Sequence, residues 1–484
     1  MPEMPDRRVA ARPNIIWVFP DEWRHDAAGF AGNPVVRTPH LDSLAARGVT
    51  FGRAYCESPV CQPSRASLLT GLHVRDHGMD DNGHLPHTKG AFPGPRQPNF
   101  LHSLQAAGYR TAGIGKLHFG GGSARTDARE YGFDEVWEEH DKYVLWRMET
   151  PYTRHLKQRG LFEAWAEHNS SLLGWIPTPK GLMEPNPKAR RHRQRAETDV
   201  VPDAEMLDTF IADEACRYIQ EYDRKEPFFL WVAPIGPHPP WDAPQRYADL
   251  YEPGEIPLGP LNPDEVPANR WGDYLRWNLK HLGCAHWTED DYRQIGKFYY
   301  GLITQIDDAI GRIVSALVAT GRDRDTWIMF SADHGELLGD HGLISKRVFY
   351  ESAVRVPQLV VPPTGPIGAS AVGGLTQGFD LVATILDLAG AQWTDPRVAA
   401  KSLLPAIEGK STGRDVVFSQ IAGFLMVATR SHKLVVHEET LEPGAFYDLV
   451  SDPDERTNLI GVAAARQALE EMLDKAREFL AGRQ

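Results

Sequence analysis

The chain has 484 residues, of which 42% are hydrophobic and 24% charged, and its formal net charge at pH 7 is −13. A chain of this length exceeds the roughly 250–300 residues that one hydrophobic core usually serves, which favours a large domain with a smaller companion. The acidic balance disfavours a general nucleic-acid binder, although a local cluster of cations could still bind an anionic substrate.

The cysteine count and the hydropathy exclude further classes of protein. The four cysteines, Cys56, Cys61, Cys216 and Cys284, include no CxxC pair and are too few for a disulfide framework. The first apolar run, Ile15–Phe19, is too short for a signal-peptide core, and no later run approaches the roughly 18 apolar residues of a membrane span. We therefore expect a cytoplasmic protein that does not bind a membrane.

Strands and helices alternate through most of the chain. Continuous apolar runs next to turn residues predict buried strands at Asn14–Phe19, Tyr109–Lys116, Pro227–Pro234 and Thr326–Glu336. Apolar residues at helical spacing predict helices at Leu41–Arg47, Asn99–Ala107, Ala204–Glu221, Gly301–Leu317 and Phe379–Leu388. This alternation is typical of an α/β domain.

Two regions depart from that alternation. Residues 140–205 show little strand pattern and are predicted to be an insertion on the active-site face; their basic run, Lys188–Arg195, is either a solvated loop or a guide for anionic substrates. Beyond about residue 395, Leu425–His437 and Ala445–Ile460 resemble antiparallel strands, and a helix is predicted at Ala463–Leu480. We predict a main domain at residues 1–395 and a C-terminal subdomain with an antiparallel sheet and a final helix at residues 396–484.

Polar side chains follow three of the predicted strands. Asp21 and Glu22 follow the first, His238 lies just beyond the third, and Asp333 and His334 lie at the end of the fourth. Ligands of open α/β sheets bind at the carboxyl ends of the strands, so these groups could form a divalent-cation site. Each one alone would be typical of a turn residue or a helix N-cap.

Several cationic side chains lie near strand ends or in loops rich in glycine and proline: Arg65, Lys116, His118, His238 and Lys346. An oxyanion such as sulfate or phosphate needs several fixed donors of this kind. In GKLHFG the flanking glycines of Lys116 and His118 favour a close approach of the backbone to a ligand. The alternative for each lysine is a solvated surface position.

The segment CQPSR, Cys61–Arg65, allows more than one interpretation. Cys61 could be a small buried apolar residue, or a thiolate nucleophile whose pKa is lowered at a helix N-terminus. Neither alternative explains Pro63 and Arg65 at their spacings.

CQPSR followed by ASLLTG resembles the signature of the type I sulfatases, in the alkaline-phosphatase-like superfamily. Other segments resemble the family in the same order: VFPDEWRHD, TPHLDSLAARGVTF, GIGKLHFG, GPHPPW, SADHGELLGDHGLISK, YESAVRVP and YDLVSDPDERTNL. Together they cover most of residues 13–460 outside the insertion. The resemblance implies an alkaline-phosphatase-like fold, with a large mixed central sheet, helices on both faces and a small C-terminal antiparallel sheet.

The resemblance also implies roles for the residues named above. A formylglycine-generating enzyme would oxidise Cys61 to formylglycine, and Arg65 would orient its hydrate. One divalent metal ion would be held by Asp21, Glu22, Asp333, His334 and the modified residue 61. The substrate sulfate would be surrounded by Lys116, His118, His238 and Lys346.

Two positions depart from the family pattern. Sulfatases more often carry Asp or Gln where this chain has Glu22, and calcium-dependent arylsulfatases often carry Asn where it has His334. The family implies Ca²⁺, whereas an imidazole ligand suits Mn²⁺ better.

The expected function is a sulfuric ester hydrolase acting on a small sulfate ester. The alternative is a phosphonate monoester hydrolase or phosphodiesterase of the same superfamily, which GPHPPWDAP and GLITQIDDAIGRI also resemble; Lys116 and His118 favour the sulfatase. An inactive binding protein would require a broken motif. No nucleic-acid partner is expected, and a homo-oligomer is compatible with the superfamily.

Overall fold

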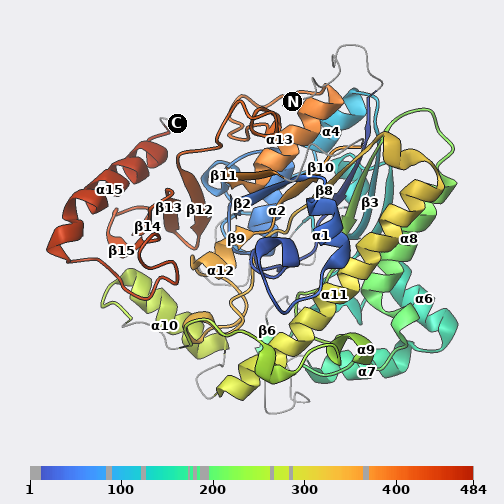
Figure 1. Ribbon diagram of the computed structural model, residues 1–484, viewed down its shortest axis with the longest axis horizontal. Helices are drawn as coiled ribbons and strands as arrows, with labels where there is room; N and C mark the ends of the chain where they lie inside the picture. The colour runs from blue at the N-terminus through green and yellow to red at the C-terminus, as the bar shows by residue number, and fades with distance from the viewer. Residues whose placement is uncertain are drawn as a thin grey trace.

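The computed structural model describes residues 12–82, 90–120, 127–172, 175–177, 183–185, 196–261, 266–282, 287–363 and 370–482 (Figure 1). Cys284 and the basic run at 188–195 lie outside the described residues. Among the helices of these ranges, none is long and apolar enough to cross a membrane.

The centre of the molecule is a nine-stranded mixed sheet. Its strands follow one another in the order β11-β2-β10-β8-β1-β7-β3-β4, and β9 pairs with β2. The five strands from β8 to β4 are mutually parallel, whereas β9 and β10 run antiparallel to their neighbours. Their bounds are β1 Asn14–Val18, β2 Val49–Tyr55, β3 Arg110–Lys116, β4 Glu135–Glu139, β7 Phe228–Ala233, β8 Thr326–Phe330, β9 Arg355–Val356, β10 Leu359–Val361 and β11 Ser370–Gln377.

Helices cover both faces of this sheet. Successive side chains of a strand point to opposite faces, so Ile16 and Val18 of β1 join one core cluster and Ile15 and Trp17 join another. The first cluster contains residues of α1 (Pro39–Ala45), α8 (Leu207–Glu221) and α11 (Glu289–Ala319), and the second those of α2 (Cys61–Thr70), α4 (Phe100–Ala106) and α13 (Gly378–Ala389). The predicted mixed sheet with helices on both faces is confirmed.

The predicted strands and helices of this region are present, with different ends. The largest difference is α11, which begins at Glu289 and not at Gly301, because Thr288 and Asp291 form a capping box at its N-terminus. Strand β8 ends at Phe330, so residues 331–336 form a loop.

The described part of the predicted insertion is largely helical. It contains α5 (Lys142–Leu145), α6 (Pro151–Arg159) and α7 (Phe162–Leu172), and a two-stranded sheet of β5 (Trp175–Pro177) and β6 (Met183–Pro185). Figure 1 shows α6 and α7 at the end of the molecule opposite α15.

The last part of the chain forms a four-stranded antiparallel sheet, in the order β12-β13-β14-β15. The strands are β12 Val417–Ile421, β13 Phe424–Ala428, β14 His432–His437 and β15 Pro443–Asp448. One face packs against α15 (Arg466–Leu480), and the other joins a core cluster with α10 (Arg270–Leu282) and residues near β2. The predicted antiparallel sheet and final helix are confirmed; residues 449–460 carry no strand, and the domain boundary near residue 395 stays a prediction.

Four short α-helices complete the α-helices of the described residues: α3 Val74–His77, α9 Gln245–Ala248, α12 Glu351–Val354 and α14 Leu404–Ile407.

Candidate active site

The predicted site residues meet at one edge of the central sheet. Strands β8, β1, β7 and β3 are adjacent and parallel, so their carboxyl ends lie side by side. Each strand therefore delivers the residues that follow it to the same place. Those residues are Asp333 and His334 after β8, Asp21 and Glu22 after β1, His238 after β7, and Lys116 and His118 at the end of β3.

Helix α2 carries the two predicted site residues of the segment CQPSR. Cys61 is its first residue, and Arg65 lies four residues on, on the same side of the helix. Every residue of α2 is buried, and Gly71 ends the helix in a left-handed conformation with φ 71°. The spacing of Cys61 and Arg65 thus places both side chains in the site.

Cys61 lies among the groups predicted to hold a metal. Its side chain is 1% exposed, and its Sγ lies 3.2 Å from His334 Nε2 and 3.7 Å from Asp21 Oδ1. His334 Nδ1 lies 2.9 Å from the Gly335 carbonyl oxygen, so the other ring nitrogen faces the thiol. Ligand atoms of Asp21, Cys61, Asp333 and His334 all lie within 4.8 Å of one another.

The cations around the thiol oppose the effect of its burial. Burial alone would raise the pKa of Cys61, but the charges of Lys346, Lys116 and His334 lower that pKa well below its ordinary value. The Cys61 thiol therefore ionises more readily than an ordinary thiol does.

The donor set at this cluster suits a divalent cation. Two carboxylates and one imidazole converge on a buried point, and carboxylate oxygens with an imidazole nitrogen are common ligands of divalent metals. The residues present therefore fit a metal ion, and the choice between Ca²⁺ and Mn²⁺ stays open.

Arg65 contacts both carboxylates of this cluster. Its Nε donates to Asp333 Oδ2 at 3.0 Å, its Nη2 lies 3.4 Å from Asp21 Oδ2, and its Nη1 donates to the Lys116 carbonyl oxygen at 2.5 Å. The side chain is fully buried. Burial alone would lower the pKa of Arg65, but Asp333 and Asp21 raise it.

Glu22 faces a neighbouring group of residues. Its carboxylate accepts a hydrogen bond from Ser345 Oγ at 3.0 Å, lies 2.5 Å from Lys346 Nζ and lies 3.4 Å from His238 Nε2. Ligand atoms of Asp21, Glu22 and His238 also lie within 4.8 Å of one another. Glu22 therefore contacts the predicted sulfate-binding residues directly, and its role as a metal ligand stays a prediction.

Lys116 contacts Asp21, and His118 interacts with Cys61. Lys116 Nζ lies 2.5 Å from Asp21 Oδ2, and the charges of Asp141 and Asp21 raise the pKa of this lysine in spite of its burial. A side-chain interaction of His118 contributes to the lowered pKa of Cys61. His118 and Glu22 both have left-handed backbones, with φ 60° and φ 66°, a strain often found at functional sites.

Asp141 is the main site residue that the sequence patterns did not predict. It follows β4, and its Oδ2 lies 3.0 Å from Lys116 Nζ and 3.7 Å from His238 Nε2. The strand-end rule applies to it as well, but EVWEE is too charged to be recognised as a strand. Ser345 and Tyr299, which contact Glu22, were missed too, because neither directly follows a strand and the segment SADHGELLGDHGLISK, which contains Ser345, indicates no role for it.

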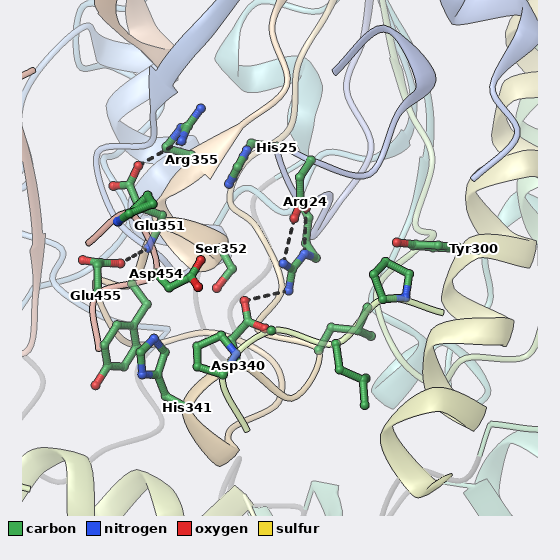
Figure 2. A pocket seen from close by; sticks show the side chains of 18 residues that line it. Arg24, His25, Tyr300, Asp340, His341, Glu351, Ser352, Arg355, Asp454 and Glu455 are labelled. Carbon is green, nitrogen blue, oxygen red and sulfur yellow. Dashed lines mark hydrogen bonds and ion pairs between the residues drawn. The ribbon is translucent and has the colours of Figure 1, made fainter. Parts of the chain in front are cut away.

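A separate cavity of about 330 Å³ lies around Arg24 (Figure 2). Figure 2 shows Arg24 pointing toward Asp340. The Arg24 Nη1 atom lies 3.1 Å from Asp340 Oδ2, and the ring of His341 stacks on Tyr350. None of its described lining residues is a predicted site residue. The cavity is thus distinct from the site above.

Comparison with known proteins assigns the family. The family model described as Sulfatase matches residues 13–391, and that described as N-sulphoglucosamine sulphohydrolase, C-terminal, matches residues 339–481. The chain is 29% identical to the multifunctional alkaline phosphatase superfamily protein PehA of Trinickia caryophylli, over 96% of this chain and 94% of that protein. It is 28% identical to an arylsulfatase of Clostridium perfringens, over 97% and 94% of the two chains.

A solved structure shares the fold of this chain. The phosphonate monoester hydrolase of Agrobacterium radiobacter superposes with a TM-score of 0.78 at 25% identity, covering 98% of this chain and 95% of that chain. The matching Sulfatase model spans all the predicted site residues, from Asp21 to Lys346. The chain therefore belongs to the sulfatase family and is a hydrolase of sulfate esters.

Proposed function

We propose that this sulfatase cleaves small aryl sulfate monoesters with a formylglycine hydrate at position 61 as its nucleophile. The observation that carries the proposal is the position of Cys61. It is the first residue of α2, is buried, and lies among Asp21, Asp333 and His334 with Arg65 one helical turn away. In the proposed enzyme, Sγ stands in for the hydroxyl oxygens of the hydrate.

The modification would precede folding. Cys61 is 1% exposed, and Pro63 and Arg65 are buried with it. A modifying enzyme must read CQPSR as an accessible segment, so we propose that a formylglycine-generating enzyme acts on the chain before α2 packs against the sheet.

The first step would form an enzyme-bound sulfate ester. One hydroxyl of the hydrate loses its proton to a neighbouring carboxylate, Asp21 or Asp333, and its oxygen attacks sulfur. The bond between sulfur and the ester oxygen breaks, and the leaving oxygen takes a proton from His238 or Lys346. Asp21, Asp333 and His334 would hold a divalent metal ion, with Glu22 nearby. The positive charge of the ion would favour the ionised hydroxyl and neutralise the oxyanion.

The second step would release sulfate. The remaining hydroxyl of residue 61 loses its proton to His118, the aldehyde forms again, and the bond between its carbon and the sulfate oxygen breaks. Water then hydrates the aldehyde. An unmodified cysteine or a serine lacks the second hydroxyl and would stop at the covalent ester.

The experiment uses two cysteines in one peptide. Trypsin should release Ala54–Arg65, which contains Cys56 and Cys61. In the active protein we expect mass spectrometry to find one alkylatable thiol, at Cys56, and an aldehyde at position 61. Two intact thiols in active enzyme would contradict the formylglycine proposal.

Kinetics with matched variants test the same proposal. Cys61→Ala should abolish turnover of an aryl sulfate, whereas Cys56→Ala should keep most of it, because Cys56 is also buried but lies outside the cluster of ligand atoms.

The second candidate is a phosphonate monoester or phosphodiester hydrolase, which the similarity to the Agrobacterium structure favours. Parallel kinetics on an aryl sulfate, a phosphodiester and a phosphonate monoester decide between the two. We expect the aryl sulfate to have the highest kcat/KM; a phosphoester preference of about a hundredfold, or ~2.7 kcal/mol, would reverse the ranking.

A further inference from the structure

Asp141 places a carboxylate beside the groups proposed to bind the sulfate. Its side chain is 17% exposed, and its Oδ2 contacts Lys116 Nζ at 3.0 Å and approaches His238 Nε2 at 3.7 Å. Burial opposes ionisation of Asp141, but the charges of His238, Lys116 and His118 lower its pKa below the ordinary value. A negative charge therefore lies next to three of the proposed sulfate-binding side chains.

A strand pairing and an ion pair of neighbouring residues hold this carboxylate in place. On one side, β4 pairs with β3 so that Glu139 lies opposite Lys116, two residues before Asp141. On the other side, the buried Lys142 lies 2.5 Å from Asp242 Oδ1, on the loop that follows His238. Asp141 is thus fixed between the end of β3, which carries Lys116, and the loop that carries His238.

A fixed negative charge discriminates between anions of different charge. At a given distance it repels a dianion twice as strongly as a monoanion, because the Coulomb energy scales with the product of the charges. The transferable group of a sulfate monoester or a phosphodiester carries one negative charge. A phosphate monoester carries about two above its second pKa of roughly 6.

We propose that Asp141 is a specificity-determining residue, which makes the site select esters whose transferable group is singly charged and reject phosphate monoesters. The inference rests on the proposed function, since it takes Lys116, His118 and His238 as the groups around the oxyanion. Asp141 offsets part of their positive charge and leaves enough for a monoanion.

The variant Asp141→Asn tests the inference with two substrates that share one leaving group but differ in the charge of the transferable group. Asparagine retains the shape of the side chain and caps a helix as well as aspartate, so α5 can still begin at Lys142. At about pH 8, where the phosphate is doubly charged, we compare kcat/KM for p-nitrophenyl sulfate and p-nitrophenyl phosphate. The ratio of phosphate to sulfate turnover should rise by about tenfold, or ~1.4 kcal/mol.

The neighbouring ion pair supplies a matched control. Asp242→Asn removes another buried carboxylate from a lysine, Lys142, next to Asp141. If Asp141 only supports the fold, both variants should lower the two activities by a common factor and leave their ratio unchanged. An unchanged ratio in Asp141→Asn, or an equal rise in Asp242→Asn, would overturn the inference.

A binding measurement separates this inference from the proposed function. Inorganic sulfate and hydrogen phosphate are dianions at about pH 8, and a thermal-shift titration measures their affinity without turnover. Both should bind Asp141→Asn about tenfold more tightly than the wild type. Failure of the wild type to cleave aryl sulfates would refute the proposed function, whereas unchanged anion affinity would refute the role of Asp141.

Discussion

Arg65 shows how one side chain serves two purposes in this protein. Within CQPSR it belongs to the segment that resembles the family signature, and in the folded chain it lies fully buried between Asp21 and Asp333. Without Arg65, the two carboxylates would remain buried with less compensating charge. A buried carboxylate that loses its partner costs far more than an exposed one.

We therefore expect Arg65→Met to lower the free energy of unfolding of the metal-free protein by about 3–5 kcal/mol. Urea denaturation measures it. The control is Arg397→Met, which breaks the pair with Asp395, where the arginine side chain is 54% exposed; that loss should stay below about 1 kcal/mol. Equal losses in both variants would show that burial does not strengthen the Arg65 pairs.

At the scale of elements, the packing of β3 against β7 positions Lys116. Gly115 has φ 100°, and a Cβ built on it would lie 2.0 Å from the carbonyl oxygen of Ala233 in β7. Only glycine allows the two strands to approach this closely with that backbone conformation. The glycine before Lys116 in GKLHFG is therefore required by strand packing; no ligand contact is needed to explain it.

Gly115→Ala should separate β3 from β7 and displace Lys116. Gly108→Ala is the matched control, since its φ is 84° but the nearest atom to its Cβ is the end of the Arg12 side chain at 3.4 Å. Both variants have the cost of a left-handed alanine, about 1–2 kcal/mol. Gly115→Ala should lose a further 1–3 kcal/mol, roughly the cost of overpacking, and most of its sulfatase activity. Equal unfolding midpoints for the two variants would contradict this account.

At the scale of the whole molecule, a buried ion cluster joins the two large sheets. Lys433 of β14 is fully buried; its Nζ lies 2.6 Å from Glu351 Oε1 and 2.8 Å from Glu455 Oε1, and it donates to the Phe349 carbonyl oxygen at 2.8 Å. Glu351 also accepts a hydrogen bond from Tyr55 of β2. Burial raises the pKa of Glu455 from 4.5 to about 7.

This pKa predicts how stability depends on pH. A carboxyl whose pKa is raised in the folded state stabilises the fold below its unfolded pKa, and that contribution is lost as the pH rises toward the folded pKa. As the pH rises from about 5 to about 8, the wild type should therefore lose stability that Glu455→Gln keeps. The free energy of unfolding of the variant, relative to that of the wild type, should rise by about 2–3 kcal/mol over this range. Urea denaturation at both pH values, with the half-buried Glu442→Gln as control, measures the change; a difference independent of pH would contradict it.

The sequence by itself determined the central strands, the motif residues and their convergence on one edge. Apolar runs such as Asn14–Phe19 are buried on both faces of the sheet, so composition alone identifies them. Parallel neighbours then bring Asp21, His238 and Asp333 together, whatever the length of chain between them. Cys61 and Arg65 are four residues apart, a spacing that α2 turns into one shared side, although the sequence patterns predicted no helix there.

Only the tertiary structure decided the partners of those residues. Strand β4 lies at the sheet edge with most of its side chains partly exposed, so its charged sequence conceals both the strand and Asp141 behind it. The direction of Glu22 toward Ser345 and Lys346 depends on its left-handed backbone and on a loop more than 300 residues away. Ion pairs depend on distances of a few ångströms between segments far apart in the chain, and local residue patterns encode burial and periodicity but not those distances.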